Sequence, residues 1–216
     1  KMGGGFLYLC AFLCFLTFNF YTTWWIYFAS PEGMAMAVIL NSLFMGIVFL
    51  WFYKIKKLFG KRKGYLSLIF FWSSFEWIHY HWEFSHPWSS YGNVFANMPE
   101  LVQWYEYTGV LGGSVWLLVV NILIFELLRK VMSLGNPIKS HIKSIAVILG
   151  IVVIPMCISL LQFNGYEEVK NPKNIVVVQP NIDPYFDKFG GMTEGEQVNR
   201  ILSLAEEKMT AETQYV

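Results

Sequence analysis

The residues with the clearest potential for chemistry lie around one stretch of this chain, from position 76 to position 109. Glu76 lies inside an apolar run, where an ionisable group is costly unless it is paired or faces a cavity. His79 and Tyr80 follow it at the i+3 and i+4 spacing that places side chains on one face of a helix. We therefore interpret Glu76 as part of a hydrogen-bonded cluster, with direct contact to a substrate as the alternative.

The stretch from Glu83 to Gly109 is rich in aromatic residues and contains no lysine or arginine. Its aromatic residues are Phe84, Trp88, Tyr91, Phe95, Trp104, Tyr105 and Tyr107. Such rings suit the headgroup layer of a membrane, where a side chain is half in apolar and half in wet surroundings. The stretch is either an interfacial belt or a lipid-handling arm, and a connection of this length is more often functional than idle.

Other groups that could react or bind metal have no suitable partners in the sequence. His81 and His86 have no Cys or Asp at a recognised metal-ligand spacing. The cysteines lie in apolar runs without a CxxC pair, at Cys10, Cys14 and Cys157. No nucleophile elbow, P-loop, zincin or dinucleotide-binding motif is present. We expect no metal site, no cofactor and no catalytic residue within this sequence.

The composition indicates that membrane helices position these residues. Of 216 residues, 55% are hydrophobic and 14% are charged, whereas a soluble domain has about 25% charged residues. These values argue against a soluble globule, a disordered chain and a nucleic-acid binder. Five stretches reach the length of about 20 apolar residues that a helix needs to cross the hydrocarbon core. They lie near residues 6–28, 34–53, 65–82, 110–128 and 144–163.

The distribution of charge predicts how these spans are oriented. The link 54–64 holds six Lys or Arg and no acid, and the link 129–143 holds four and no acid. By the positive-inside rule both links are cytoplasmic, and everything after residue 163 lies outside. Glu126 and Arg129, three residues apart near the inner face, are expected to form an ion pair.

The composition changes at residue 164, after which nine acids and five bases occur with no long apolar run. The β-branched run 174–180 predicts a buried strand, and residues 181–191 predict a loop. A capping box formed by Thr193 and Glu196 then begins a helix that extends to about residue 211. The last three residues start a second strand, so the order is β-α-β, the opening of an α/β domain.

We therefore expect a transmembrane domain over residues 1–163 and the first part of an external domain over 164–216. One helix between two short strands cannot bury a core of its own. For this reason, and because the first residue is Lys1, we expect the sequence to be a fragment cut at both ends.

Several short motifs follow one another along the chain. They are Trp25-Ile26-Tyr27, Glu76-Trp77, His86-Pro87-Trp88 with Gly92, the run of Gln103, Gly109, Gly112 and Asn121, and the segment NIVVVQPNI. In this order they resemble the apolipoprotein N-acyltransferase family, which joins a helical membrane domain to a periplasmic nitrilase-like domain. Two positions depart from the family pattern, because His79 stands in place of an arginine and His86 in place of a phenylalanine.

The resemblance implies an acyltransferase of the bacterial inner membrane. Such an enzyme takes an acyl chain from a phospholipid as a cysteine thioester and passes it to the N-terminal amine of a diacylglyceryl apolipoprotein. The family's Glu-Lys-Cys triad would lie beyond Val216, in the rest of the nitrilase-like α-β-β-α sandwich, so the fragment itself is expected to be inactive. The resemblance also implies a lipid entrance formed by Trp25, Tyr27, Glu76, Trp77, Pro87, Trp88, Gly92, Gln103 and Gly109.

Two other functions remain open from the sequence. One is a related membrane-nitrilase fusion that serves polyprenyl-phosphate mannose synthesis. The other is a transporter or channel subunit with an external domain, which inverted repeats or paired broken helices would favour. The sequence leaves the oligomeric state open.

Overall fold

The computed structural model describes residues 3–134, 137–183 and 186–216. Residues 135–136 of the predicted basic link 129–143 and residues 184–185 of the predicted loop 181–191 therefore lie outside the described residues. The chain divides into two compact units, Lys1–Tyr166 and Glu167–Val216, each of which is described by itself.

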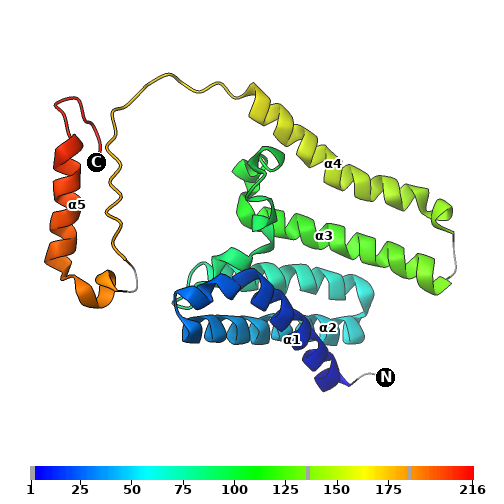
Figure 1. Cartoon of the computed structure of the whole chain (residues 1–216). Coiled ribbons are helices and arrows are strands. Elements are labelled where there is room, and N and C mark those ends of the chain that lie inside the picture. The colour runs from blue at the N-terminus through cyan, green and yellow to red at the C-terminus, as the bar shows by residue number, and fades with distance from the viewer. Residues whose placement is uncertain (1–2, 135–136, 184–185) are drawn as a thin grey trace. The chain divides into compact units, whose positions relative to one another are not determined.

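The first unit begins with two consecutive helices, α1 and α2 (Figure 1). Helix α1 covers Gly4–Thr23 and continues as the 3-10 helix η1, Trp24–Phe28. Helix α2 covers Pro31–His79. Ser30 caps α2, because its Oγ accepts a hydrogen bond from the backbone N–H of Gly33 at 3.0 Å.

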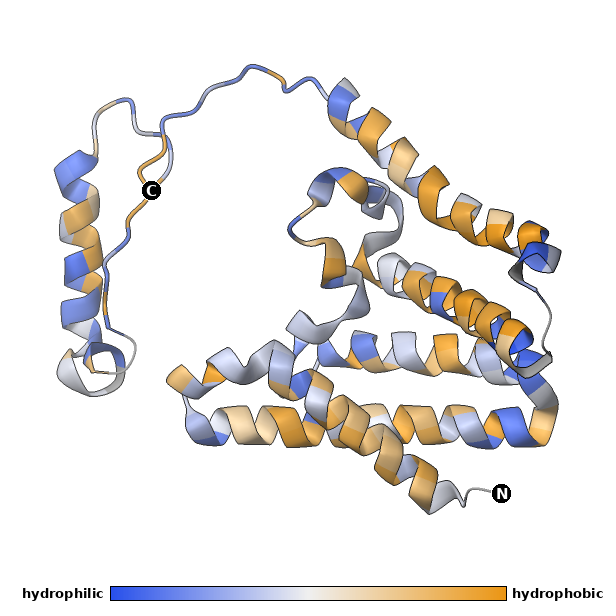
Figure 2. Ribbon diagram, turned by 45° about the vertical axis from the view of Figure 1, so that its right-hand side comes forward, coloured by the Kyte–Doolittle hydropathy of each residue, from blue (hydrophilic) through white to orange (hydrophobic). Residues whose placement is uncertain are grey.

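Helix α2 folds back on itself at Gly60, where φ is 85° and ψ is 176°. This backbone conformation lies in the left-handed region that glycine adopts without penalty. The two arms, 31–59 and 61–79, lie side by side (Figures 1 and 2). Close to the bend, a Cβ at Gly64 would lie 2.8 Å from the Cα of Lys56, so glycine permits this close approach.

The rest of the first unit consists of a connection of short turns between α2 and α3, residues 80–104, and two further long helices. We call residues 80–104 the link. The link contains the 3-10 helices η2 (Pro87–Ser89), η3 (Tyr91–Phe95) and η4 (Pro99–Leu101). Helix α3 (Tyr105–Leu134) follows, and the 3-10 helix η5 (Ile138–His141) leads into α4 (Ile142–Gly165).

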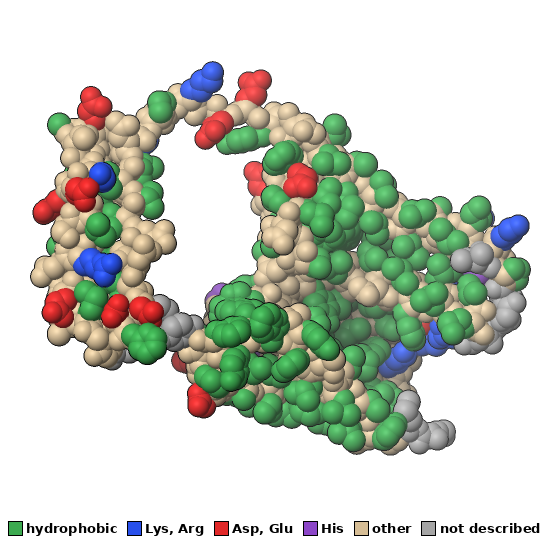
Figure 3. Space-filling model, in the orientation of Figure 1, with side chains coloured by type: hydrophobic (Ala, Val, Ile, Leu, Met, Phe, Trp, Pro, Cys, Tyr) green, Lys and Arg blue, Asp and Glu red, His purple; other side chains and the backbone are tan. Residues whose placement is uncertain are grey.

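Four helical segments in the described part of the chain are long and apolar enough to cross a membrane, so the protein is an α-helical membrane protein. They are Gly4–Phe28, Pro31–His79, Tyr105–Met132 and Lys139–Gly165. The sequence predicted five spans. The count differs because the predicted span 34–53 and most of the predicted span 65–82 lie in one helical segment, α2. Apolar side chains cover much of the visible surface of these helices (Figure 3), as expected for contact with lipid.

The centre of the first unit is a small core where α2 and α3 meet. Met45 and Trp72 come from the two arms of α2, and Leu118 comes from α3; all three are buried. Phe15 of α1 and Tyr91 of the link pack against them. The core therefore ties the link to three helices.

The described residues of the second unit contain the short π-helix η6 (Asp187–Gly191) and the helix α5 (Glu194–Lys208). Helix α5 is capped as predicted. The hydroxyl of Thr193 accepts a hydrogen bond from the N–H of Glu196, and the carboxylate of Glu196 accepts one from the N–H of Thr193. Among the described residues no strand is formed where two were predicted, and the pairing is one isolated parallel bridge between Ile175 and Tyr215. A pair of short strands without neighbours offers too little burial to extend further.

Candidate functional site

Glu76 joins the second arm of α2 to the link that follows it. The residue is 2% exposed, and its Oε1 accepts hydrogen bonds from Trp72 Nε1 at 3.0 Å and from the backbone N–H of Tyr91 at 2.9 Å. The rings of Trp72 and Tyr91 also stack, with centroids 4.7 Å apart. Glu76 therefore fixes the start of η3 against α2.

His79 and His86 form a second buried cluster near Glu76. His79 Nδ1 accepts a hydrogen bond from Trp82 Nε1 at 3.0 Å. His86 lies beside His79 and packs edge-on against Trp88, with ring centroids 5.4 Å apart. Burial lowers the pKa of the His86 imidazole from its ordinary value. His86 is therefore uncharged near pH 7 and packs as an aromatic ring between His79 and Trp88.

Gly92 lies tightly against the first turns of α3. Its N–H donates to Ser114 Oγ at 2.9 Å, and its carbonyl accepts from the Tyr105 hydroxyl at 3.1 Å. A Cβ at this position would lie 2.1 Å from the carbonyl oxygen of Val110. Gly109, with φ 66°, bends the start of α3 just before this contact. The two glycines thus let the link and α3 meet closely.

A buried polar network connects α1, α2 and the link, and it was not recognised from the sequence. Asn19 Nδ2 donates to Ser42 Oγ at 3.0 Å, and Asn19 Oδ1 accepts from Asn41 Nδ2 at 2.6 Å. Asn41 Nδ2 also lies 3.4 Å from Ser89 Oγ. Asn19 and Ser42 are completely buried. The only sequence signal was that these polar residues interrupt apolar runs.

An outer cavity of about 530 Å³ lies between α1, the link and α3. Polar groups from the end of α1 and from the link form one part of its wall: Thr22, Thr23, Ser89, Ser90 and Asn93. Phe18, Leu117 and Leu118 lie one or more turns deeper along α1 and α3 and form an apolar part. Trp88, a predicted entrance residue, also lines this cavity. The cavity therefore has both a polar and an apolar portion.

Two other predicted entrance residues lie close to Trp88. Trp25 of η1 contacts it edge-on, with ring centroids 5.9 Å apart, and so supports the wall of the outer cavity. Pro87 begins η2, and its carbonyl accepts a hydrogen bond from Asn93 Nδ2 at 2.9 Å. The structure thus brings Trp25, Pro87 and Trp88 together.

Trp77, Tyr27 and Gln103, which were also predicted at the entrance, do not line the outer cavity. Trp77 is exposed on α2 and stacks on His81, with ring centroids 4.3 Å apart. Tyr27 is exposed at the end of η1. Gln103 Nε2 donates to the carbonyl of Pro99 at 2.8 Å, so it holds a turn of the link.

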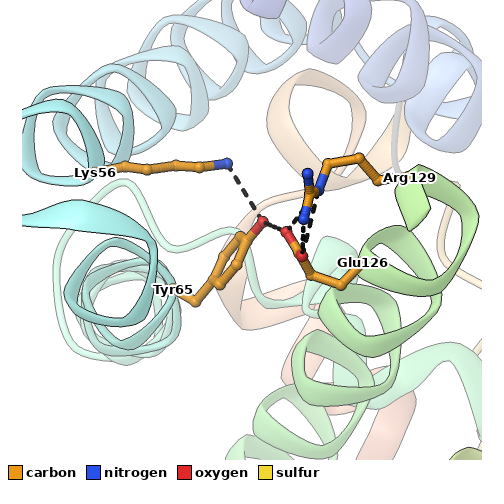
Figure 4. Close-up of polar contacts among 4 residues, drawn as sticks. All are labelled: Lys56, Tyr65, Glu126 and Arg129. Atoms are coloured by element: carbon orange, nitrogen blue, oxygen red, sulfur yellow. Dashed lines mark hydrogen bonds and ion pairs between the residues drawn. The ribbon is translucent and has the colours of Figure 1, made fainter. Parts of the chain in front are cut away.

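A second cavity, which we call the inner groove, has a volume of about 730 Å³ and adjoins the outer cavity, with which it shares Leu118 and Asn121. Beside the inner groove, Tyr65 donates to Glu126 Oε1, and Arg129 Nη2 binds Glu126 Oε2 at 2.7 Å (Figure 4). The ion pair predicted between Glu126 and Arg129 is confirmed.

The linings of the outer cavity and the inner groove, which contain both polar and apolar side chains, favour the binding of an amphipathic molecule. In residues 3–134, 137–183 and 186–216, no group of three or more His, Cys, Asp or Glu is placed to hold a metal ion. Cys10, Cys14 and Cys157 are exposed on membrane helices. The outer cavity combines two aromatic residues of the stretch 83–109, Trp88 and Tyr91, with room for a ligand.

Comparison with known proteins gives two matches. Residues 3–123 match the family model described as the apolipoprotein N-acyltransferase N-terminal domain. The apolipoprotein N-acyltransferase of Chlorobaculum tepidum is 31% identical over 204 residues, which cover 94% of this chain and 37% of that protein. The chain thus spans a little over a third of the length of this curated relative. No solved structure gives a significant match.

Proposed function

Because this chain belongs to the apolipoprotein N-acyltransferase family, we propose that it forms the membrane part of an enzyme that acylates bacterial lipoproteins with a phospholipid as the acyl donor. The acceptor would be the N-terminal amine of a diacylglyceryl apolipoprotein. The outer cavity would admit the donor phospholipid.

The amphipathic lining of the outer cavity is the observation that carries this proposal. Most of its polar side chains come from the link and the end of α1, where a headgroup and its ester bonds would lie, and Asn121 of α3 is a further polar group deeper in the cavity. Phe18, Leu117 and Leu118 lie deeper along the membrane helices, where an acyl chain would lie, and Trp88 and Val94 add apolar surface from the link. Trp88, with its exposed ring beside Trp25, would flank the entrance.

The reaction itself would take place on residues outside this sequence. A cysteine thiolate would attack the donor ester to form a thioester, with cleavage of the ester bond and release of the lysophospholipid. The lipoprotein amine would then attack the thioester to form an amide and release the thiolate. A glutamate would act as general base, and a lysine would stabilise the oxyanion. Cys10, Cys14 and Cys157 would not take this part, because they are exposed on apolar membrane helices, where a thiolate is disfavoured.

We further propose that each arm of α2 crosses the membrane, which gives five spans with the link and the second unit on the periplasmic side. Six bases in the link 54–64 support this orientation. The second unit would be the start of a nitrilase-like domain, beginning near residue 164. The parallel bridge between Ile175 and Tyr215, on either side of α5, supports that β-α-β order.

A cavity-filling substitution tests the role of the outer cavity in the full-length enzyme. Leu117→Trp would fill the apolar portion, whereas Ile124→Trp places the same ring on an exposed position of α3. We expect Leu117→Trp to lower the rate of acyl transfer from phospholipid to a diacylglyceryl peptide at least about tenfold, since a filled cavity cannot hold the acyl chain.

Ile124→Trp is the control for the general effect of a tryptophan side chain in α3. Ile124→Trp should retain acyl transfer within about twofold of the unmodified enzyme. Equal activity of the two variants would contradict the proposal that the donor binds in the outer cavity.

A further inference from the structure

The inner groove differs from the outer cavity in its charge. Its apolar wall comes from three helices: Leu7 of α1, Phe49, Phe52 and Leu68 of α2, and Leu118, Ile122 and Phe125 of α3. Lys56 and Lys57, beside the bend of α2, also line it. The groove therefore combines an apolar channel with two positive charges.

Lys56 is held in place over the groove by aromatic rings. Its Nζ lies 4.7 Å from the centroid of Tyr65, 5.1 Å from that of Phe52 and 5.6 Å from that of Phe125. Nζ also donates to the Tyr65 hydroxyl at 3.3 Å. These contacts orient a side chain that is otherwise flexible. An ammonium group has three N–H donors, so Lys56 retains donors for a ligand.

The nearby acid does not neutralise the lysines. The Glu126 carboxylate is engaged by Arg129 through three contacts of 2.7 to 3.3 Å and by Tyr65 (Figure 4). The link 54–64 adds four more bases beyond Lys56 and Lys57, and no acid. The mouth of the groove is therefore strongly positive, and an anion there would be favoured.

The geometry points to one occupant for the inner groove, an anionic phospholipid whose phosphate is bound by Lys56 and Lys57 and whose acyl chain lies along the apolar wall. Charge complementarity favours it over a zwitterionic lipid, since basic residues at a membrane surface attract anionic headgroups. The apolar wall favours it over a soluble anion, which would leave that wall uncovered. This lipid would lie at the basic end of the helices, so it is distinct from the proposed acyl donor and does not depend on the proposed function.

Native mass spectrometry of the chain in detergent micelles tests the site. Phosphatidylglycerol and phosphatidylcholine with the same acyl chains would be titrated against the unmodified chain and against the double variant Lys56→Gln/Lys57→Gln. We expect the chain to retain phosphatidylglycerol in preference to phosphatidylcholine, and the double variant to lose at least about tenfold of that affinity.

The matched control is Lys54→Gln/Lys63→Gln, which removes the same charge from the same link without touching the residues that line the groove. It should bind phosphatidylglycerol within about twofold of the unmodified chain. Equal losses in both double variants would overturn the proposal in favour of diffuse attraction. Equal retention of the two lipids by the unmodified chain would also overturn it.

A single substitution tests the site in case the double variant Lys56→Gln/Lys57→Gln does not fold. Lys57 is exposed, so Lys57→Glu leaves the contacts of Lys56 with the aromatic rings intact. It should weaken phosphatidylglycerol binding while the circular dichroism spectrum stays unchanged. Unchanged binding by Lys57→Glu, or a chain that dimerises and retains no lipid, would argue against the site.

Discussion

The indole of Trp116 in α3 donates a hydrogen bond to the carbonyl of Ile151 in α4, with 2.8 Å between Nε1 and the oxygen. In an unbroken helix this carbonyl would accept from the N–H of residue 155. Residue 155 is proline and has no N–H. Trp116 therefore supplies, from a neighbouring helix, the donor that α4 lacks in a medium without water.

Removal of this donor should loosen α3 from α4. Trp116→Phe keeps an aromatic ring for packing on Phe95 and Trp104 but removes the N–H. We expect the free energy of unfolding in mixed micelles to fall by about 1–2 kcal/mol, the usual effect of leaving a buried acceptor unpaired. Titration with a denaturing detergent, followed by circular dichroism, measures this change.

The background of Pro155→Ala provides the control for this effect. Alanine restores the N–H that pairs with the Ile151 carbonyl inside α4, so Trp116→Phe should destabilise this background less. If Trp116→Phe has the same effect with proline and with alanine at position 155, the hydrogen bond to Ile151 does not stabilise the pair.

Gly92 should tolerate no side chain, because its missing Cβ is what lets η3 reach α3. Gly92→Ala would place a Cβ 2.1 Å from the carbonyl oxygen of Val110. The backbone would have to move and would weaken the bond from the Gly92 N–H to Ser114. We expect a loss of about 2–4 kcal/mol in the free energy of unfolding.

Gly150 offers a matched control for this substitution. It lies within α4, and a Cβ there would meet only Ile154 Cδ1, at 3.8 Å. Gly150→Ala should leave the protein as stable or stabilise it by up to about 1 kcal/mol, since alanine favours a helix. If Gly92→Ala behaves like Gly150→Ala in the same unfolding experiment, the close contact with Val110 is not required.

The membrane helices could be predicted from the sequence because their signal is local. The apolar runs at 6–28, 110–128 and 144–163 lie within Gly4–Phe28, α3 and Lys139–Gly165. The capping box that begins α5 is equally local, since it depends on two residues three positions apart. Each of these features is decided by neighbours in the sequence.

The contacts that shape the site could not be predicted because they join residues distant in the sequence. Asn19 meets Asn41, and Glu76 meets the backbone of Tyr91, only after the helices have packed. The i+3 spacing suggested His79 as a neighbour of Glu76, but the His79 ring accepts from Trp82. The predicted strands 174–180 and 214–216 depend on neighbouring strands to form a sheet.

Glu76 should act through its ability to accept hydrogen bonds. Glu76→Gln keeps a carbonyl oxygen that can accept from Trp72 Nε1 and from the N–H of Tyr91, whereas Glu76→Ala leaves both donors unpaired. We expect Glu76→Ala to destabilise the protein by about 2–4 kcal/mol and Glu76→Gln by less than half as much. Hydrogen exchange at the Tyr91 amide should rise strongly in Glu76→Ala alone. Equal exchange in both variants would show that the acceptor oxygen does not anchor η3.

His86 should make the stability of the first unit depend on pH. Burial lowers its pKa in the folded protein below the ordinary value, which is about 6.5. The unfolded chain therefore binds more protons than the folded one near pH 6, so the stabilisation is fully present above about pH 6.5 and is lost as the pH falls towards the folded pKa. We expect the free energy of unfolding to decline as the pH falls below about 6.5.

Substitution of His86 separates its contribution to this decline from that of other groups. His86→Phe keeps an aromatic ring against Trp88 and removes the titrating group, so the decline should become shallower. His81→Gln serves as the control, because His81 is exposed and stacks on Trp77. This substitution should leave the decline in stability unchanged. The measurement is the midpoint of detergent-induced unfolding at half-unit steps of pH. An unchanged decline in His86→Phe would assign the pH dependence to groups other than this buried imidazole.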